Sequence, residues 1–187
     1  MISFTKATTD ADLHQILELQ QKNLSKNLTL EETLEQGFLT VEHDFPTLKK
    51  MNNLEAATIA KEHNQIVGFL LAMTKDLRND IPILISMFDV LDELYYQNRT
   101  LQEYNYIVVG QACIAGSHRG SGIFDQCYAA YKKHLSEKYD FAVTEISRRN
   151  QRSLRAHRRV GFEMLQEFVA PDGEVWDIVV WDWRKNK

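Results

Sequence analysis

The sequence contains little cysteine, proline or glycine. Its 187 residues include 2 Cys, 3 Pro and 8 Gly. Glycine and proline together usually make up ~12% of a globular chain, so their scarcity excludes collagen-like and low-complexity classes. The two cysteines, Cys113 and Cys127, are too few for a disulfide framework and lack the spacing of metal ligands. We therefore expect neither a disulfide framework nor a metal site.

Long apolar runs and an excess of positive charge are also missing. No stretch approaches the ~18 consecutive apolar residues of a membrane span, because Asp89 and Asp92 interrupt the longest candidate, 81–94. The first residues, MISFTKATTDADL, have neither the basic nor the apolar region of a signal peptide. The 22 basic and 26 acidic residues give a net charge of −4, which offers no bulk attraction for nucleic acid. These absences predict a cytoplasmic protein with neither a membrane nor a nucleic-acid partner.

What is present is typical of one globular α/β domain over residues 1–187. A chain of this length buries about 70% of its unfolded surface, which is enough for a core of its own. Apolar patterning predicts strands at Ile2–Ala7, Ala57–Glu62, Ile66–Thr74, Tyr104–Ala115, Phe141–Ile146, Phe162–Val169 and Val175–Trp183. Within the fourth of these strands, Gly110 predicts a bulge or a close backbone approach. Helical spacing and capping residues predict helices after Thr9 or Asp10, from Thr29 to Gly37, at the end of GFLTVEHDFPTLKK, after Asp80 and Pro82, and at Gly122–Glu137 and Gln151–Val160.

A Gly-rich turn, GSHRGSGIF, joins the strand at 104–115 to the helix that follows it. Such a turn presents unpaired backbone N–H groups and the positive end of the helix dipole, which together bind phosphate-like anions. The turn lacks the Gly-Lys-Ser/Thr of a Walker A loop and the glycine spacing of a dinucleotide fingerprint. Taken alone, it is either an anion site or an ordinary strand-to-helix turn.

The helix after residue 150 is rich in arginine. Six arginines lie between 148 and 159, and four of them share one helical face: Arg148, Arg152, Arg155 and Arg159. Such a face is usually solvated. It could instead form the anion-facing edge of a cofactor cleft, or a nucleic-acid surface, which the negative net charge disfavours.

Together, the two stretches resemble the GNAT superfamily of acyl-CoA-dependent N-acyltransferases, over about residues 57–183. The family's pyrophosphate motif is Arg or Gln, two residues, Gly, one residue, then Gly or Ala. Arg119 and Gly122 match it, whereas Phe124 departs from it at the last position. The second family motif is matched in spacing by Asn150, Ser153, His157, Gly161 and Phe162.

The resemblance implies an α/β (α+β) fold, in which helices flank both faces of a central mixed, mostly antiparallel sheet. It also implies acetyl-CoA as co-substrate. The residues that it places against the cofactor are Cys113, Ile114, Arg119, Gly120, Ser121, Gly122, Ile123, Asn150, Ser153 and His157. We expect the arginine face to lie at the periphery of this cleft, and the Phe124 ring to cover or redirect the pantetheine arm.

The resemblance further implies direct attack of an amine on the thioester. Backbone groups of Cys113 and Ile114 would bind the pantetheine or polarise the thioester carbonyl. Many relatives protonate the leaving thiolate from a Tyr at the position of His157, which makes His157 the candidate general acid; its alternative role is packing or capping. The sequence singles out no general base: Glu103, His43 and Glu145 are candidates, each with a structural role as its alternative, and water chains serve some relatives. Tyr104, Tyr106 and Tyr128 are other hydroxyls near the expected cleft.

The acceptor would lie between GFLTVEHDF and the helix at 83–95. Two carboxylates beside an imidazole, at Glu42, His43 and Asp44, would attract a cationic amine. The alternative is a solvated polar loop. Several alternatives stay open. The acceptor is either a small-molecule amine or a peptide amine, and the donor could carry another acyl group. The domain could also bind CoA as a sensor or scaffold without turnover, and it could form a homodimer.

Overall fold

The computed structural model describes residues 1–79 and 85–184. A seven-stranded sheet has the spatial order β1 (Ile2–Lys6), β2 (Thr58–Glu62), β3 (Gln65–Met73), β6 (Tyr106–Ile114), β7 (Phe141–Ser147), β9 (Val175–Asp182) and β8 (Glu163–Val169). Neighbouring strands are antiparallel except β6 and β7, which are parallel. The predicted mixed, mostly antiparallel sheet is therefore confirmed.

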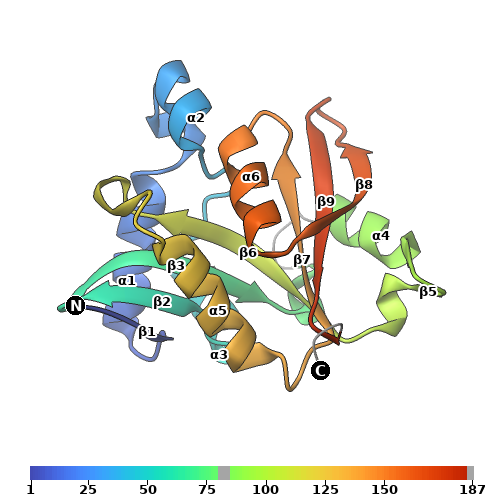
Figure 1. Cartoon of the computed structure of the whole chain (residues 1–187), viewed down its shortest axis with the longest axis horizontal. Coiled ribbons are helices and arrows are strands. Elements are labelled where there is room, and N and C mark those ends of the chain that lie inside the picture. The colour runs from blue at the N-terminus through green and yellow to red at the C-terminus, as the bar shows by residue number, and fades with distance from the viewer. Residues whose placement is uncertain (80–84, 185–187) are drawn as a thin grey trace.

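The helices pack on both faces of this sheet. They are α1 (Asp10–Gln21), α2 (Leu30–Gln36), α3 (Phe45–Leu54), α4 (Ile85–Glu93), α5 (Ile123–Leu135) and α6 (Gln151–Val160). In Figure 1, α5 and α6 lie in front of the sheet and α1 and α3 lie behind it. Two clusters of buried side chains result, one containing Leu48 and Phe69 and the other containing Tyr131 and Ala142. No helix in the described part of the chain is long and apolar enough to span a membrane.

The helix starts follow the predicted capping residues. The Thr9 hydroxyl accepts from the Asp12 N–H at 3.1 Å, and the Asp12 carboxylate accepts from the Thr9 N–H. Thr29 and Glu32 form the same reciprocal pair at the start of α2. Each pair satisfies two backbone donors that would otherwise lack a partner. Helix α2 ends at Gly37, as expected.

Strands β6 and β7 separate part of the way along their length. They pair only where Tyr106–Val108 lies beside Phe141–Val143. On the other side of β6, the register with β3 shifts between Leu71 and Ala72, and Gly110 is the extra residue. This bulge confirms the prediction at Gly110, and bulges bend the strand that contains them. Beyond it, β6 and β7 diverge and leave a gap within the sheet.

The segment around residue 95 differs from the prediction. The helix was expected to include Tyr95, but Tyr95–Tyr96 (β4) pairs with Arg99–Thr100 (β5) in a short hairpin. Gln97 in its turn has a φ of 58°, a conformation that apolar periodicity does not reveal. The predicted helix start at Asp80 and Pro82 lies outside the described residues.

Candidate active site

The Gly-rich turn places several backbone N–H groups at the start of α5. Gly120 and Gly122 have φ values of 78° and 79°, which glycine adopts without strain. The first N–H that bonds within the helix belongs to Gln126 and donates to the Gly122 carbonyl. The preceding N–H groups, at 123–125, are therefore without a helical acceptor. This end of α5 has the geometry of an anion site.

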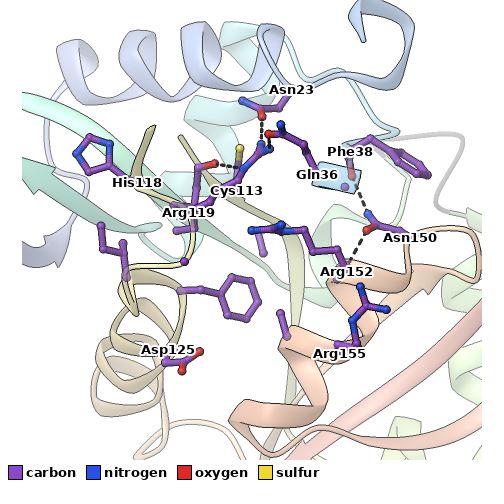
Figure 2. A pocket seen from close by; sticks show the side chains of 18 of the residues that line it. Asn23, Gln36, Phe38, Cys113, His118, Arg119, Asp125, Asn150, Arg152 and Arg155 are labelled. Atoms are coloured by element: carbon purple, nitrogen blue, oxygen red, sulfur yellow. Dashed lines mark hydrogen bonds between the residues drawn. The ribbon is translucent and has the colours of Figure 1, made fainter. Parts of the chain in front are cut away.

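A cleft of about 500 Å³ opens beside this turn. Its walls come from residues 118–125, from α6, and from residues 36–39 of the N-terminal half. Figure 2 shows the side chains of Arg119 and Arg152 lying across it. Among the described residues that line it, four are arginines and Asp125 is the only carboxylate. The cleft is therefore cationic, although the whole chain has a net charge of −4.

The expectation that the arginine face lies at the periphery is wrong for three of its four members. Arg152, Arg155 and Arg159 line the cleft, because they follow one another along α6 on the side that faces the Gly-rich turn. Arg148 lies before α6 begins and forms ion pairs with Asp177, at 2.7 Å, and with a glutamate of β8. Arg159 pairs with Asp125, whereas Arg155 forms no hydrogen bond or ion pair with the described residues.

Arg119 connects the Gly-rich turn to the N-terminal half. Its guanidinium donates to the side-chain oxygens of Asn23 and Gln36, the latter at 2.6 Å, and its Nε donates to the Ile114 carbonyl at 3.0 Å. Figure 2 shows these bonds at the top of the cleft. All three acceptors are neutral, so they orient the guanidinium without compensating its charge.

Asn150 performs two structural tasks at the start of α6. Its Oδ1 accepts from the Ser153 N–H at 3.1 Å and so caps the helix, while its Nδ2 donates to the Phe38 carbonyl at 3.1 Å. The backbone of Gly37 passes so close that a Cβ there would lie 2.8 Å from Asn150 Oδ1. Residues 37–41 are thereby held against α6.

His157 is buried behind the cleft wall. Its Nδ1 lies 2.9 Å from the Ser153 carbonyl, which only accepts, so Nδ1 carries the proton and Nε2 accepts from the Tyr128 hydroxyl at 2.6 Å. Burial lowers the pKa of His157 to about 4. The Phe124 ring packs edge-on against the imidazole. A neutral, buried imidazole has no spare proton for a thiolate.

A second, narrower cavity of about 80 Å³ occupies the gap between β6 and β7. Five residues line both this gap and the cleft: Phe38, Leu39, Ala112, Asn150 and Ser153. Glu145 lines the gap, and burial raises the pKa of its carboxyl to about 7. Its Oε2 is buried and has no hydrogen-bond partner among the described residues. This carboxyl is therefore poised to exchange a proton near neutral pH.

The backbone of Cys113 does not face this gap. The Ala115 N–H donates to the Val67 carbonyl of the neighbouring β3, and backbone groups two residues apart in a strand point the same way. The N–H and carbonyl of Cys113 therefore point to β3, and those of Ala112 and Ile114 point to the open side. Of the two predicted backbone contacts, only Ile114 lies on the correct side. Burial raises the pKa of the Cys113 thiol to about 12.

The three residues that were expected to attract the amine, Glu42, His43 and Asp44, form local hydrogen bonds and ion pairs instead. Glu42 pairs with Lys26 and Gln21. Asp44 caps α3 by accepting from the Thr47 N–H at 2.9 Å, and the buried His43 donates its backbone N–H to a side chain of α1. Among the described residues, none of the three lines the cleft or the gap. The same loop does reach the gap, but through residues 38–41 that precede these three.

Sequence reasoning missed Asn23, Gln36 and Phe38, which hold Arg119 and Asn150. Local patterns carry no signal for these contacts, because their partners lie 83 to 112 residues further along the chain. Gly37 was expected only as a helix stop and as the first residue of the segment GFLTVEHDF beside the acceptor. Among the described residues, no group of three or more His, Cys, Asp or Glu is placed to hold a metal ion.

This architecture was compared with known families, curated proteins and solved structures. No family model matches the sequence, and no curated protein does. Solved structures match over nearly the whole chain. A chain of the NatC complex bound to Gag peptide and CoA is 13% identical, with a TM-score of 0.67, and the match covers 97% of this chain and 98% of that one. An acetyltransferase of the GNAT family from Streptococcus agalactiae is 12% identical, with a TM-score of 0.66 and coverage of 97% and 95%.

A third similar structure is a spermidine N-acetyltransferase chimera from Vibrio cholerae and hSSAT. It is 13% identical, with a TM-score of 0.61, and the match covers 100% of this chain and 99% of that one. At such identities the likeness establishes the fold. The chain has the GNAT fold, as its motifs predicted.

Proposed function

We propose that this chain is an N-acetyltransferase that transfers the acetyl group of acetyl-CoA to a primary amine. The observation that carries the proposal is the junction of a cationic cleft with a narrow gap that holds a carboxyl, at Ala112, Asn150 and Ser153. A thioester on a polyanionic carrier can enter through the cleft, and an amine can enter through the gap. The two reactants would meet at the junction.

The cleft suits the phosphates of CoA. The pyrophosphate is assigned to the free backbone N–H groups at 123–125, which begin with Ile123, and to the turn before them, formed by Gly120, Ser121 and Gly122, with the Arg119 charge beside them. Arg152 and Arg155 are assigned to the 3′-phosphate, since they line the cleft without a carboxylate partner. The Phe124 side chain packs against the wall and leaves the N–H groups of the turn available.

The proposed reaction is a direct transfer. The lone pair of the neutral amine forms an N–C bond with the thioester carbonyl carbon, the C–S bond breaks, and the thiolate leaves with the electron pair. The amine nitrogen loses a proton to the Glu145 carboxylate, and the thiolate takes a proton from water. The backbone N–H of Ala112, which faces the junction, would stabilise the oxyanion formed on the way.

Glu145 is the strongest of the three candidate bases. Its carboxyl lines the gap, and its pKa of about 7 suits proton transfer at neutral pH. Glu103 instead caps the turn after Thr100, and burial holds the pKa of His43 at about 4. His157 is assigned a positioning role, in which its imidazole orients Ser153 at the junction.

The test is a thiol-release assay with acetyl-CoA and a panel of primary amines, together with thermal unfolding in the presence of acetyl-CoA. We expect acetyl-CoA to raise Tm, because a ligand that binds only the folded state stabilises it, by about 2.7 kcal/mol at 100 times Kd. We also expect amine-dependent thiol release. Stabilisation without release from any amine would identify a CoA-binding module without turnover, which the lack of a proton donor at His157 favours as the second candidate. Faster release from propionyl- or succinyl-CoA would identify a different donor.

A further inference from the structure

The gap between β6 and β7 is narrow, and its walls are tied together. Thr144 Oγ1 donates to the Val109 carbonyl at 2.9 Å and bridges the two strands at the closed end. On the opposite wall, the Gln111 amide donates to the Val41 carbonyl, and Gln20 donates to Gln111 at 3.0 Å. These hydrogen bonds hold residues 38–41 in place. The gap is therefore rigid and keeps its small volume of about 80 Å³.

The lining of the gap also lacks positive charge. Among the described residues that form it, only Glu145 and His157 are ionisable. His157 is neutral, because burial lowers its pKa to about 4. No arginine of the described chain lines the gap: Arg148 and Arg149 form ion pairs with carboxylates of β9 and the turn before it, and Arg152, next to Ser153, lines the cleft instead. A carboxylate or phosphate on the acceptor would therefore lose its hydration in the gap without gaining a cationic partner.

We propose that the acceptor is a primary amine at the end of an unbranched methylene chain, with no anionic group beside the amine. A chain of methylenes is the thinnest group that can carry an amine through this passage to the junction. A branch at the carbon next to nitrogen would have to displace walls that buried hydrogen bonds fix. The buried Glu145 Oε2, which has no partner among the described residues, then accepts a hydrogen bond from the amine.

This inference rests on the proposed acetyl transfer, and the experiment separates the two. Thiol release from acetyl-CoA is measured with n-butylamine and sec-butylamine, which have the same formula and differ only in the branch. Glycinamide and glycine form a second pair, which differs in the anionic group; their rates are compared per neutral amine. We expect kcat/KM for n-butylamine to exceed that for sec-butylamine at least about 10-fold, and glycinamide to exceed glycine similarly.

Two variants connect the selectivity to the gap. Val109→Ala removes two methyl groups from a residue that lines the gap, and we expect it to reduce the preference for n-butylamine. Val108→Ala, the matched control, removes the same groups from the opposite face of β6 and should leave the preference unchanged. If Val109→Ala lowers stability too far, Val41→Ala widens the gap from the other wall.

Equal rates within both amine pairs would overturn the inference and leave the proposed function intact. The same holds if Val109→Ala and Val108→Ala change the preference alike. No thiol release with any amine, despite binding of acetyl-CoA, would overturn the proposed function and this inference with it.

Discussion

Glu145 combines a buried carboxyl oxygen that lacks a partner with a pKa of about 7. As the base, it acts only when ionised, so kcat/KM for the amine should rise through neutral pH beyond the rise expected from amine deprotonation. Glu145→Gln should lower kcat about 10²- to 10⁴-fold and abolish that additional rise. Steady-state rates over a pH series, with the affinity for acetyl-CoA measured in parallel, check this.

The matched control for Glu145 is Glu103→Gln, because Glu103 accepts hydrogen bonds from Thr100 and lines neither cavity. We expect its pH profile to match that of the unmodified chain. An unchanged pH profile for Glu145→Gln would remove Glu145 from the proton transfer and leave it as a packed carboxyl.

Gly122 is constrained by its backbone rather than by its surroundings. Its φ is 79°, yet a Cβ there would meet only the end of the Gln126 side chain, at 3.9 Å. Gly122→Ala should therefore cost about 1–2 kcal/mol through the left-handed conformation, and should weaken acetyl-CoA binding because the turn relaxes away from its N–H arrangement. Calorimetric titration and Tm measure the two effects.

Gly173 provides the control for that substitution. It also has a positive φ, 84°, with open space around it, but it lies in the turn before β9. We expect Gly173→Ala to lower Tm to a similar extent without changing the Kd of acetyl-CoA. If both substitutions lowered Tm but neither changed Kd, the turn would not bind the cofactor.

At the scale of an element, α6 carries its positive charges toward the cleft. Replacing Arg152 and Arg155 together by Ala should weaken acetyl-CoA binding about 10- to 100-fold, since charge-assisted hydrogen bonds to a phosphate are lost. The affinity for acetyl-dephospho-CoA, which lacks the 3′-phosphate, should change much less. Arg158→Ala is the control, because Arg158 lies on the same helix and does not line the cleft. A loss that is equal for both ligands would place these arginines elsewhere along the cofactor.

The elements also differ in how far the sequence could predict them. Helix α6 and the turn before α5 were predictable, because Asn150, Gly122 and their caps act over a few residues. The contribution of α2 and of the residues after it was not, since the contacts of Gln36 to Arg119 and of Phe38 to Asn150 depend on tertiary packing. The inward direction of Arg152 and Arg155 was misjudged for the same reason: a helical face is visible in sequence, but the structure opposite it is not. Glu145 was named only among alternatives, because its burial depends on the separation of β6 from β7.

At the scale of the whole molecule, buried ionisable groups set the pH dependence of stability. The pKa values of His43 and His157 are about 4 in the folded chain, below their usual 6.5, so the unfolded chain binds more protons in this window and stability is lost as pH falls through it. Glu145 opposes this, because its folded pKa of about 7 exceeds the usual 4.5 and stability is gained as pH falls. Two groups outweigh one, so we expect Tm to fall between pH of about 6.5 and about 5.

Glu145→Gln removes the opposing contribution. Its Tm should fall more steeply on acidification than that of the unmodified chain, although it should be the more stable of the two above neutral pH. Calorimetry on both proteins over the same pH series measures this. Parallel curves would mean that Glu145 has a similar pKa in the folded and unfolded chains.

The bond from Asn150 to the Phe38 carbonyl joins residues 112 positions apart. During synthesis, at ~5–20 residues per second, about 6 to 22 seconds pass between the appearance of residue 38 and that of residue 150. Over that time the exposed leucines of α2, Leu30 and Leu34, are on a segment whose anchor has not yet been made. A nascent chain stalled before α6 should therefore be cut by protease near residues 30–40. After release of the full-length chain, the same peptide bonds should be protected from cleavage.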